Sequence, residues 1–291
     1  MSKFDTMYLD LCDNLLKHTI KAKVKNNITH QIPDSHWTFD LSDEFPILTI
    51  KPINWKTAIL ELMWIYQVKS NDVRWLQERN IHKWDKFKVD KDGFYPNPAI
   101  QQVLFFGEEF IDTVGTTLGY IVANGGKPSC PDQMDAAINK IVNFPDDQSN
   151  TITMYLPHFF DKAVLIPCVS EIQWIVSNGK LNSRIDQLTC DIYKLPFYIT
   201  QYAAFTCMLA HVTGLKPGKM FYSMKNIHIY EKHVDAVKEM IKRKKEAYGA
   251  PKLWLNPEIK IFYDFDNSKE LKDIKLEGYQ HLGKLTSVIK P

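Results

Sequence analysis

The stretch WKTAILELMWIYQ, from Trp55 to Gln67, is the most informative part of this 291-residue sequence. Apolar side chains occupy most of its positions, and after the first turn the charged residue is Glu61. A helix that is apolar on all sides belongs in a protein core or in a membrane. Because the stretch is shorter than the roughly 18 residues of a membrane span, it predicts a buried helix against which the rest of the chain packs.

On the N-terminal side, the spacing of apolar residues predicts one more helix and two short strands. Residues Tyr8–Lys21 carry apolar side chains at helical intervals. Residues Lys21–Ser35 are polar, contain Pro33, and are expected to form a loop. Strands are expected at Trp37–Leu41 and Pro46–Ile50, on either side of an acidic turn.

On the C-terminal side, strands and helices follow each other without the regular alternation of βαβ units. The turn Ser177–Gly179 (SNG) predicts a β-hairpin. This mixture indicates an α+β fold, and because no linker or repeat divides the chain we expect a single domain over residues 1–291. The expected elements are helix Asp132–Asn143, strands Glu171–Val176 and Leu181–Cys190, helix Pro196–Val212, strand Lys219–Ile229, helix His233–Lys245 and a further strand at Lys260–Tyr263.

The composition is that of an ordinary globular protein, with 45% hydrophobic and 24% charged residues. The 36 basic and 34 acidic residues give a net charge of +2, which argues against nucleic acid as a partner. The basic run Lys238–Lys245 is read as a solvated helix face, with an anion patch as the alternative. No signal peptide or membrane span is evident, so no membrane partner is expected and the expected location is the cytoplasm.

The cysteines indicate neither a disulfide framework nor a metal site. There are five of them, an odd number, and no two form a CxxC pair. Cys168 follows a proline at the end of an apolar segment. Such a cysteine is usually a small buried hydrophobe, and the alternative is a nucleophile whose thiolate is stabilised by groups that are distant in sequence.

Several polar residues occupy positions where a polar side chain needs either a bonding partner or a function. Glu61 lies inside the apolar helix, and burying a carboxylate without partners is costly. It is either a proton-transfer group or one half of a structural pair with Arg or Lys. Asp191 lies where a strand gives way to a turn. His228 and Tyr230 are two apart in a strand, so they face the same side and can bind one ligand hydroxyl or simply line a surface.

Taken in order, short motifs along nearly the whole chain resemble those of the thymidylate synthase and pyrimidine (dCMP, dUMP) hydroxymethylase superfamily. The N-terminal motifs are FDL…EFPILTIK (Phe39–Lys51), AILELMWIYQ (Ala58–Gln67) and KWD (Lys83–Asp85). The later ones are PDD (Pro145–Asp147), PC (Pro167–Cys168), QW (Gln173–Trp174), LPF (Leu195–Phe197), YAAFTCMLAHVTGLKPG (Tyr202–Gly218), HIY (His228–Tyr230), PKL (Pro251–Leu253) and EGY (Glu277–Tyr279). The chain is identified as a divergent member.

The resemblance implies an α+β fold in which a bent mixed β-sheet, packed with helices, lies at a homodimer interface. It implies 5,10-methylenetetrahydrofolate as the one-carbon donor and a pyrimidine nucleotide or nucleoside as the substrate. Carried over by position, Cys168 is the nucleophile that adds to C6 of the pyrimidine, which requires the thiolate. Glu61 organises proton transfer, and Asp191 holds the pterin.

The remaining site residues also follow from the resemblance. His228 and Tyr230 match positions that bind the sugar 3′-hydroxyl. Tyr198 stands at the position that reads the pyrimidine, and Gln187 and Thr189 stand in the motif that follows the hairpin. The cofactor site is matched by Lys51, near the glutamate tail of the folate, and by Trp84, Leu165 and Phe197, which match its walls.

The departures from the family concern the 5′-phosphate, which the family holds with four arginines, two of them donated across the dimer. Gln148 and Ser149 replace the paired arginines, and Leu188 replaces a third. The fourth falls in Lys21–Asn27, where only lysines can stand in. Neutral side chains cannot reproduce the forked recognition of phosphate by guanidinium groups.

Two hypotheses follow. In the first, the chain is an enzyme that methylates or hydroxymethylates C5 of a pyrimidine, because Cys168, Glu61 and Asp191 all stand at their family positions. In the second, it is a catalytically weak or inactive paralogue kept for binding or assembly, because the phosphate clamp is missing.

Overall fold

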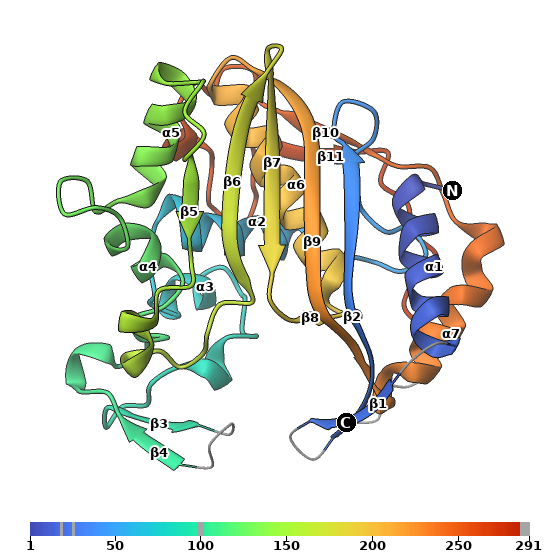
Figure 1. Cartoon of the computed structure of the whole chain (residues 1–291), viewed down its shortest axis with the longest axis horizontal. Helices are drawn as coiled ribbons and strands as arrows, with labels where there is room; N and C mark the ends of the chain where they lie inside the picture. Colours follow the sequence, from blue (N-terminus) through green and yellow to red (C-terminus); the bar gives the residue numbers. More distant parts are fainter. Residues whose placement is uncertain (18–19, 25–26, 98–101, 286–291) are drawn as a thin grey trace.

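A mixed β-sheet lies at the centre of the computed structural model, which describes residues 1–17, 20–24, 27–97 and 102–285 (Figure 1). The strands are β1 (Ile20–Val24), β2 (Asn27–Asp40), β3 (Phe94–Asn97), β4 (Gln102–Phe105), β5 (Thr151–Thr153), β6 (Val169–Ser177), β7 (Lys180–Gln187), β8 (Cys190–Asp191), β9 (Lys216–Tyr230), β10 (Lys252–Leu255) and β11 (Ile274–Glu277). The central sheet has the order β1-β2-β9-β7-β6-β5, with β8 beside β9. Strand β9 runs parallel to β7 and β8, and the other neighbours are antiparallel.

Helices cover one face of this sheet and its two flanks. They are α1 (Lys3–Lys17), α2 (Trp55–Leu62), α3 (Arg74–Gln77), α4 (Gly119–Asn124), α5 (Gln133–Asn143), α6 (Leu195–Val212) and α7 (Val234–Lys242). Short 3-10 turns lie at Asp85–Phe87, Glu108–Phe110, Pro157–Lys162, Glu231–His233, Arg243–Glu246 and Phe262–Asp264. Figure 1 shows α6 and α2 behind the sheet, α1 and α7 at one flank, and α4 and α5 at the other. The face of the sheet toward the viewer carries no described helix.

The buried helix predicted at Trp55–Gln67 is confirmed. Helix α2 begins at Asn54, whose side chain accepts a hydrogen bond from the Thr57 N–H. It continues without a break into a π-helical turn, Met63–Gln67, in which the Val68 N–H bonds the Met63 carbonyl. Such turns widen a helix by one residue and often lie at functional sites.

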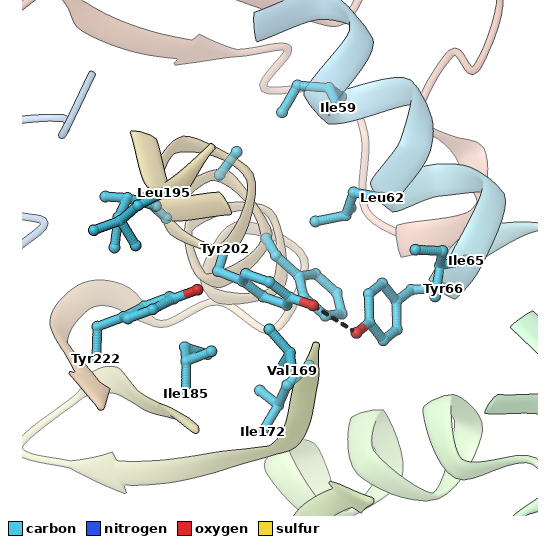
Figure 2. Close-up of a cluster of buried hydrophobic side chains, with 14 of the residues drawn as sticks. Ile59, Leu62, Ile65, Tyr66, Val169, Ile172, Ile185, Leu195, Tyr202 and Tyr222 are labelled. Carbon is cyan, nitrogen blue, oxygen red and sulfur yellow. Dashed lines mark hydrogen bonds between the residues drawn. The ribbon is translucent and has the colours of Figure 1, made fainter. Parts of the chain in front are cut away.

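The hydrophobic core lies between this helix, α6 and the covered face of the sheet. Figure 2 shows Tyr66 facing Tyr202 of α6, with Leu62 above them and Val169, Ile172 and Ile185 of the sheet below. The hydroxyl groups of Tyr66 and Tyr202 lie 3.1 Å apart and hydrogen-bond each other. Packing in this core thus holds α2 against the beginning of β6, the strand that follows Cys168.

The predicted hairpin is confirmed as β6–β7, with Ser177 opposite Lys180. Its turn residues Asn178 and Gly179 both have positive φ, as a two-residue I′ turn requires. The other predicted elements that agree with the structure are α5, α6, β9, α7 and the Trp37–Asp40 part of β2.

The helix predicted at Tyr8–Lys21 exists as α1, but it ends at Lys17, and Ile20 and Lys21 belong to β1. Three other local predictions were wrong. The expected loop Lys21–Ser35 contains most of β1 and of β2. Pairing of β2 with β9 and of β1 with β2 satisfies the backbone of a polar segment that has no strand pattern of its own. Pro46–Ile50 is buried but is not a strand, since the Thr49 N–H bonds the Asp5 carboxylate rather than a neighbouring strand. The strand expected at Lys260–Tyr263 is replaced by the 3-10 turn Phe262–Asp264.

The described ranges contain neither a membrane-spanning helix nor a disulfide. No described helix is long and apolar enough to span a bilayer. All five cysteines are free.

Candidate active site

Two pockets meet at Cys168. The larger is a cleft of about 660 Å³ that extends past α2 and the Lys83–Phe87 segment. The smaller, here called the sugar pocket after the role expected for His228, has a volume of about 300 Å³ and lies toward β8 and β9. Cys168, Lys194 and Tyr198 line both. The thiol therefore stands where ligands from the two sides would touch.

Cys168 precedes β6, and its carbonyl accepts a hydrogen bond from the Leu188 N–H at 2.8 Å. Burial raises the pKa of its thiol, and the negative charges of Asp191 and Glu61 act in the same direction. A hydrogen bond from the Tyr198 hydroxyl and the positive charge of Lys194 oppose this shift. In the ligand-free chain the group at neutral pH is therefore mainly the thiol, and attack on a substrate requires loss of its proton.

Glu61 projects from α2 into the cleft and is held by two partners. The Trp84 indole N–H donates to its Oε2 at 2.7 Å, and the Lys83 ammonium pairs with the same oxygen. Lys83 also lies over the Phe197 ring, 3.9 Å from its centroid. Of the two alternatives for Glu61, an ion pair with a lysine is present, although its partner Lys83 is half-exposed rather than buried. Because Glu61 also lines the cleft, its role in proton transfer stays a prediction.

Lys51 and Asp191 both contact Tyr193. The Lys51 ammonium donates to the Tyr193 carbonyl at 3.1 Å and lies 3.8 Å from the centre of its ring. Burial lowers the pKa of Lys51 to about 8, against the attraction of Cys12 and Asp191. One oxygen of Asp191, Oδ1, accepts the Tyr193 N–H, while the buried Oδ2 has no hydrogen-bond partner among the described residues.

The sugar pocket is lined by strand ends. The predicted pairing of His228 and Tyr230 on one side of β9 is confirmed, with ring centroids 5.2 Å apart. His228 Nδ1 lies 2.9 Å from the Asn226 carbonyl, which can only accept, so this nitrogen carries the proton. Gln187 donates to the Thr189 carbonyl at 2.8 Å and accepts from the Tyr222 hydroxyl at 2.7 Å.

All the site residues expected from the sequence lie around these two pockets. The cleft is lined by Glu61, Lys51, Trp84, Leu165, Phe197, Cys168 and Tyr198, and the sugar pocket by Asp191, His228, Tyr230, Gln187, Thr189, Cys168 and Tyr198. No group of three or more His, Cys, Asp or Glu side chains in the described part is arranged to hold a metal ion.

The polar lining residues that sequence reasoning missed include Lys83, Lys194 and Asn226. For Lys83 a signal existed, because a carboxylate in an apolar helix needs a cationic partner, but spacing did not identify which one. The lysines of Lys21–Asn27 were the expected substitutes for an arginine. Lys21 is exposed, and the Lys23 and Lys25 side chains lie outside the described part.

Comparison with known proteins agrees with this geometry. The chain matches the thymidylate synthase family over residues 6–290. It is 38% identical over 283 residues to thymidylate synthase of Clostridium beijerinckii, covering 97% of this chain and 96% of the relative. It is 33% identical over 304 residues to the enzyme of Bacillus mojavensis, covering 98% of each. The fold is similar to that of the thermostable thymidylate synthase A of Bacillus subtilis, with a TM-score of 0.83, 31% identity and 96% of each chain covered.

These similarities, together with the mixed sheet, define a class: one-carbon transferases that use 5,10-methylenetetrahydrofolate as the donor. Within that class, the chain belongs to the thymidylate synthase family.

Proposed function

We propose that the chain transfers one carbon from 5,10-methylenetetrahydrofolate to C5 of a pyrimidine nucleotide or nucleoside through a covalent adduct on Cys168. The observation that carries the proposal is that the Cys168 thiol lines both the cleft and the sugar pocket. A pyrimidine whose sugar lies near His228 would present its ring at this junction.

In the proposed reaction, the Cys168 thiolate forms an S–C6 bond, and the electron pair of the C5–C6 double bond moves to C5. C5 then takes the one-carbon unit. The carbon would leave its folate nitrogen at the methylene level as C5 loses its proton. Hydride from the folate would then give the methyl product, or water the hydroxymethyl product, as the Cys168 thiolate leaves C6 and the C5–C6 double bond re-forms. Glu61, held by Lys83 and Trp84 at the edge of the cleft, is the group available to organise these proton transfers.

The cleft fits a folate. Trp84 and Phe197 supply aromatic walls. Asp191 lines the adjoining sugar pocket, and its buried Oδ2 has no hydrogen-bond partner among the described residues, so it can accept hydrogen bonds from a pterin that reaches the junction of the two pockets. Lys51 supplies a cation near the expected glutamate tail. When bound, the folate supplies the carbon that is transferred.

The test is tritium release from 5-tritiated pyrimidine nucleotides and nucleosides in the presence of the folate. We expect release by the wild type and by Cys130→Ala, an exposed thiol outside the described lining of both pockets, but not by Cys168→Ala. Absence of release from every substrate would contradict the reaction. Release that persists in Cys168→Ala would contradict the role of the thiol. The mass of the product distinguishes methyl from hydroxymethyl transfer.

The second candidate is the inactive paralogue, and one observation favours it: burial raises the pKa of Cys168, which disfavours the attacking thiolate. It predicts no release from any substrate while folate and pyrimidine still bind.

We further propose that residues 1–291 form a single domain that acts as a homodimer through the uncovered face of the sheet. One connected core runs from Phe4 to Ile274, which supports the first part. Ile175 and Phe221 are exposed on the uncovered face, which supports the second. Sedimentation equilibrium of the wild type and of Phe221→Arg tests the dimer, which the added charge should dissociate.

A further inference from the structure

In the described lining of the sugar pocket, positive and negative charges are equal in number. Among its described lining residues the charged groups are Lys194 and Asp191, one of each sign, and their charged atoms lie 4.0 Å apart. The Lys194 side chain is 67% exposed, so solvent screens it, whereas Asp191 is 10% exposed. A second negative charge in this pocket would therefore meet a buried carboxylate more directly than it would meet a cation.

The polar groups of the pocket suit hydroxyl groups. His228 Nδ1 donates to the Asn226 carbonyl, and in a neutral imidazole Nε2 is then the acceptor. Asp191 Oδ2, which lies 4.0 Å from Lys194 Nζ, is the acceptor that the proposed function assigns to the pterin. A ligand hydroxyl can donate to His228 Nε2, whereas the oxygens of an ionised phosphate can only accept.

The arginines of the chain are engaged elsewhere. The sequence contains four, and none is among the described lining residues of either pocket. Arg74 binds Asp72, Arg79 donates to the Asn267 carbonyl, Arg184 lies 3.4 Å from Asp186, and Arg243 donates to the Gly283 carbonyl.

In the loop that carries Gln148 and Ser149, the charged side chain of Asp147 is already paired with a lysine. Ser149 donates to Asp147, and the nearby Lys140 is bound to both of them. A second copy of the chain that extended this loop toward the pocket would bring an amide, a hydroxyl and carboxylates. The loop itself contains no guanidinium group.

We propose that the substrate is a pyrimidine nucleoside with a free 5′-hydroxyl, and that the 5′-monophosphate is a poor ligand. This inference rests on the proposed function for the placement of the pyrimidine at Cys168. Its physical basis is that a dianion in a partly buried pocket is best held by charged, forked donors, whereas the described lining of this pocket has no guanidinium group and one charge of each sign, Lys194 and Asp191.

The test measures binding, independently of turnover. Isothermal titration compares 2′-deoxyuridine with its 5′-monophosphate, and 2′-deoxycytidine with its own, on the full chain with the folate present. We expect the nucleoside of at least one pair to bind ten times more tightly or better. Tighter or equal binding of both monophosphates, or no binding of any of the four compounds, would overturn the inference.

A matched pair of variants tests the role of lining charge. Leu188 lies beside Thr189 at a family arginine position, and its side chain is partly buried. Leu188→Arg should shift the ratio of affinities at least tenfold toward the monophosphate, whereas Leu188→Met, similar in size and uncharged, should leave the ratio unchanged. An unchanged ratio in a folded Leu188→Arg protein counts against the inference.

The outcomes separate this inference from the proposed function. Preferential nucleoside binding without tritium release from any substrate supports the ligand class and contradicts the reaction. Release from monophosphates alone supports the reaction and overturns the ligand class.

Discussion

Replacing Lys83 by methionine tests how the carboxylate of Glu61 is held in the cleft. The Glu61 side chain is 4% exposed and the Lys83 side chain 43% exposed. Removing one partner of a fully buried pair costs about 3–5 kcal/mol, and an exposed pair is worth about 0–1 kcal/mol. With one buried and one half-exposed member, and with Trp84 still donating at 2.7 Å, we expect a coupling energy of about 1–2 kcal/mol between these limits.

The assay is a double-mutant cycle of urea unfolding with wild type, Lys83→Met, Glu61→Gln and the double variant, all at one protomer concentration. Lys86→Met is the matched control, because Lys86 is an exposed lysine of the same segment for which the described residues show no ion pair. It should change the free energy of unfolding by less than about 0.5 kcal/mol. A Lys83–Glu61 coupling below about 0.5 kcal/mol, or an equal loss in Lys86→Met, would refute the reasoning.

Three further predictions concern Tyr198, Lys51 and Gln187, which line the two pockets. Tyr198→Phe removes the hydrogen bond that opposes the raised pKa of Cys168. At about 1 kcal/mol for that bond, alkylation of Cys168 by iodoacetamide at fixed pH should slow roughly fivefold, as measured by site-resolved mass spectrometry. Burial lowers the pKa of Lys51 from 10.5 to about 8, so the folded state is penalised while the lysine is protonated. The stability of the wild type relative to Lys51→Met should therefore rise from about pH 8 to about pH 10.5, by roughly 3 kcal/mol in urea titrations. Gln187→Leu deprives the buried Tyr222 hydroxyl of its acceptor and should cost about 2 kcal/mol in urea unfolding. Adding Tyr222→Phe to Gln187→Leu should recover part of that loss, because the hydroxyl without an acceptor is then absent.

Each of these predictions has an outcome that contradicts it. Alkylation of Tyr198→Phe at the wild-type rate would mean that the hydroxyl does not stabilise the thiolate. A flat stability difference between wild type and Lys51→Met across this pH range would mean that Lys51 is solvated. A double variant no more stable than Gln187→Leu would exclude the orphaned hydroxyl as the cause of the loss.

Several features followed from the sequence because their causes are local. The apolar stretch Trp55–Gln67 dictates a buried helix, since no other structure hides both its side chains and its backbone. The dipeptide Asn178–Gly179 dictates a tight turn, since both residues tolerate positive φ. The motif HIY places His228 and Tyr230 side by side through the two-residue period of a strand.

Other features depend on contacts between segments far apart in the chain, and the tertiary structure alone decided them. Polar residues 27–35 form a strand only because β9 lies beside them to pair with their backbone. Lys83 becomes the partner of Glu61 only because α2 and the following segment meet at the cleft. The charge of the sugar pocket depends on which side chains meet there. Neither the spacing of residues in the sequence nor the composition predicts which ones meet.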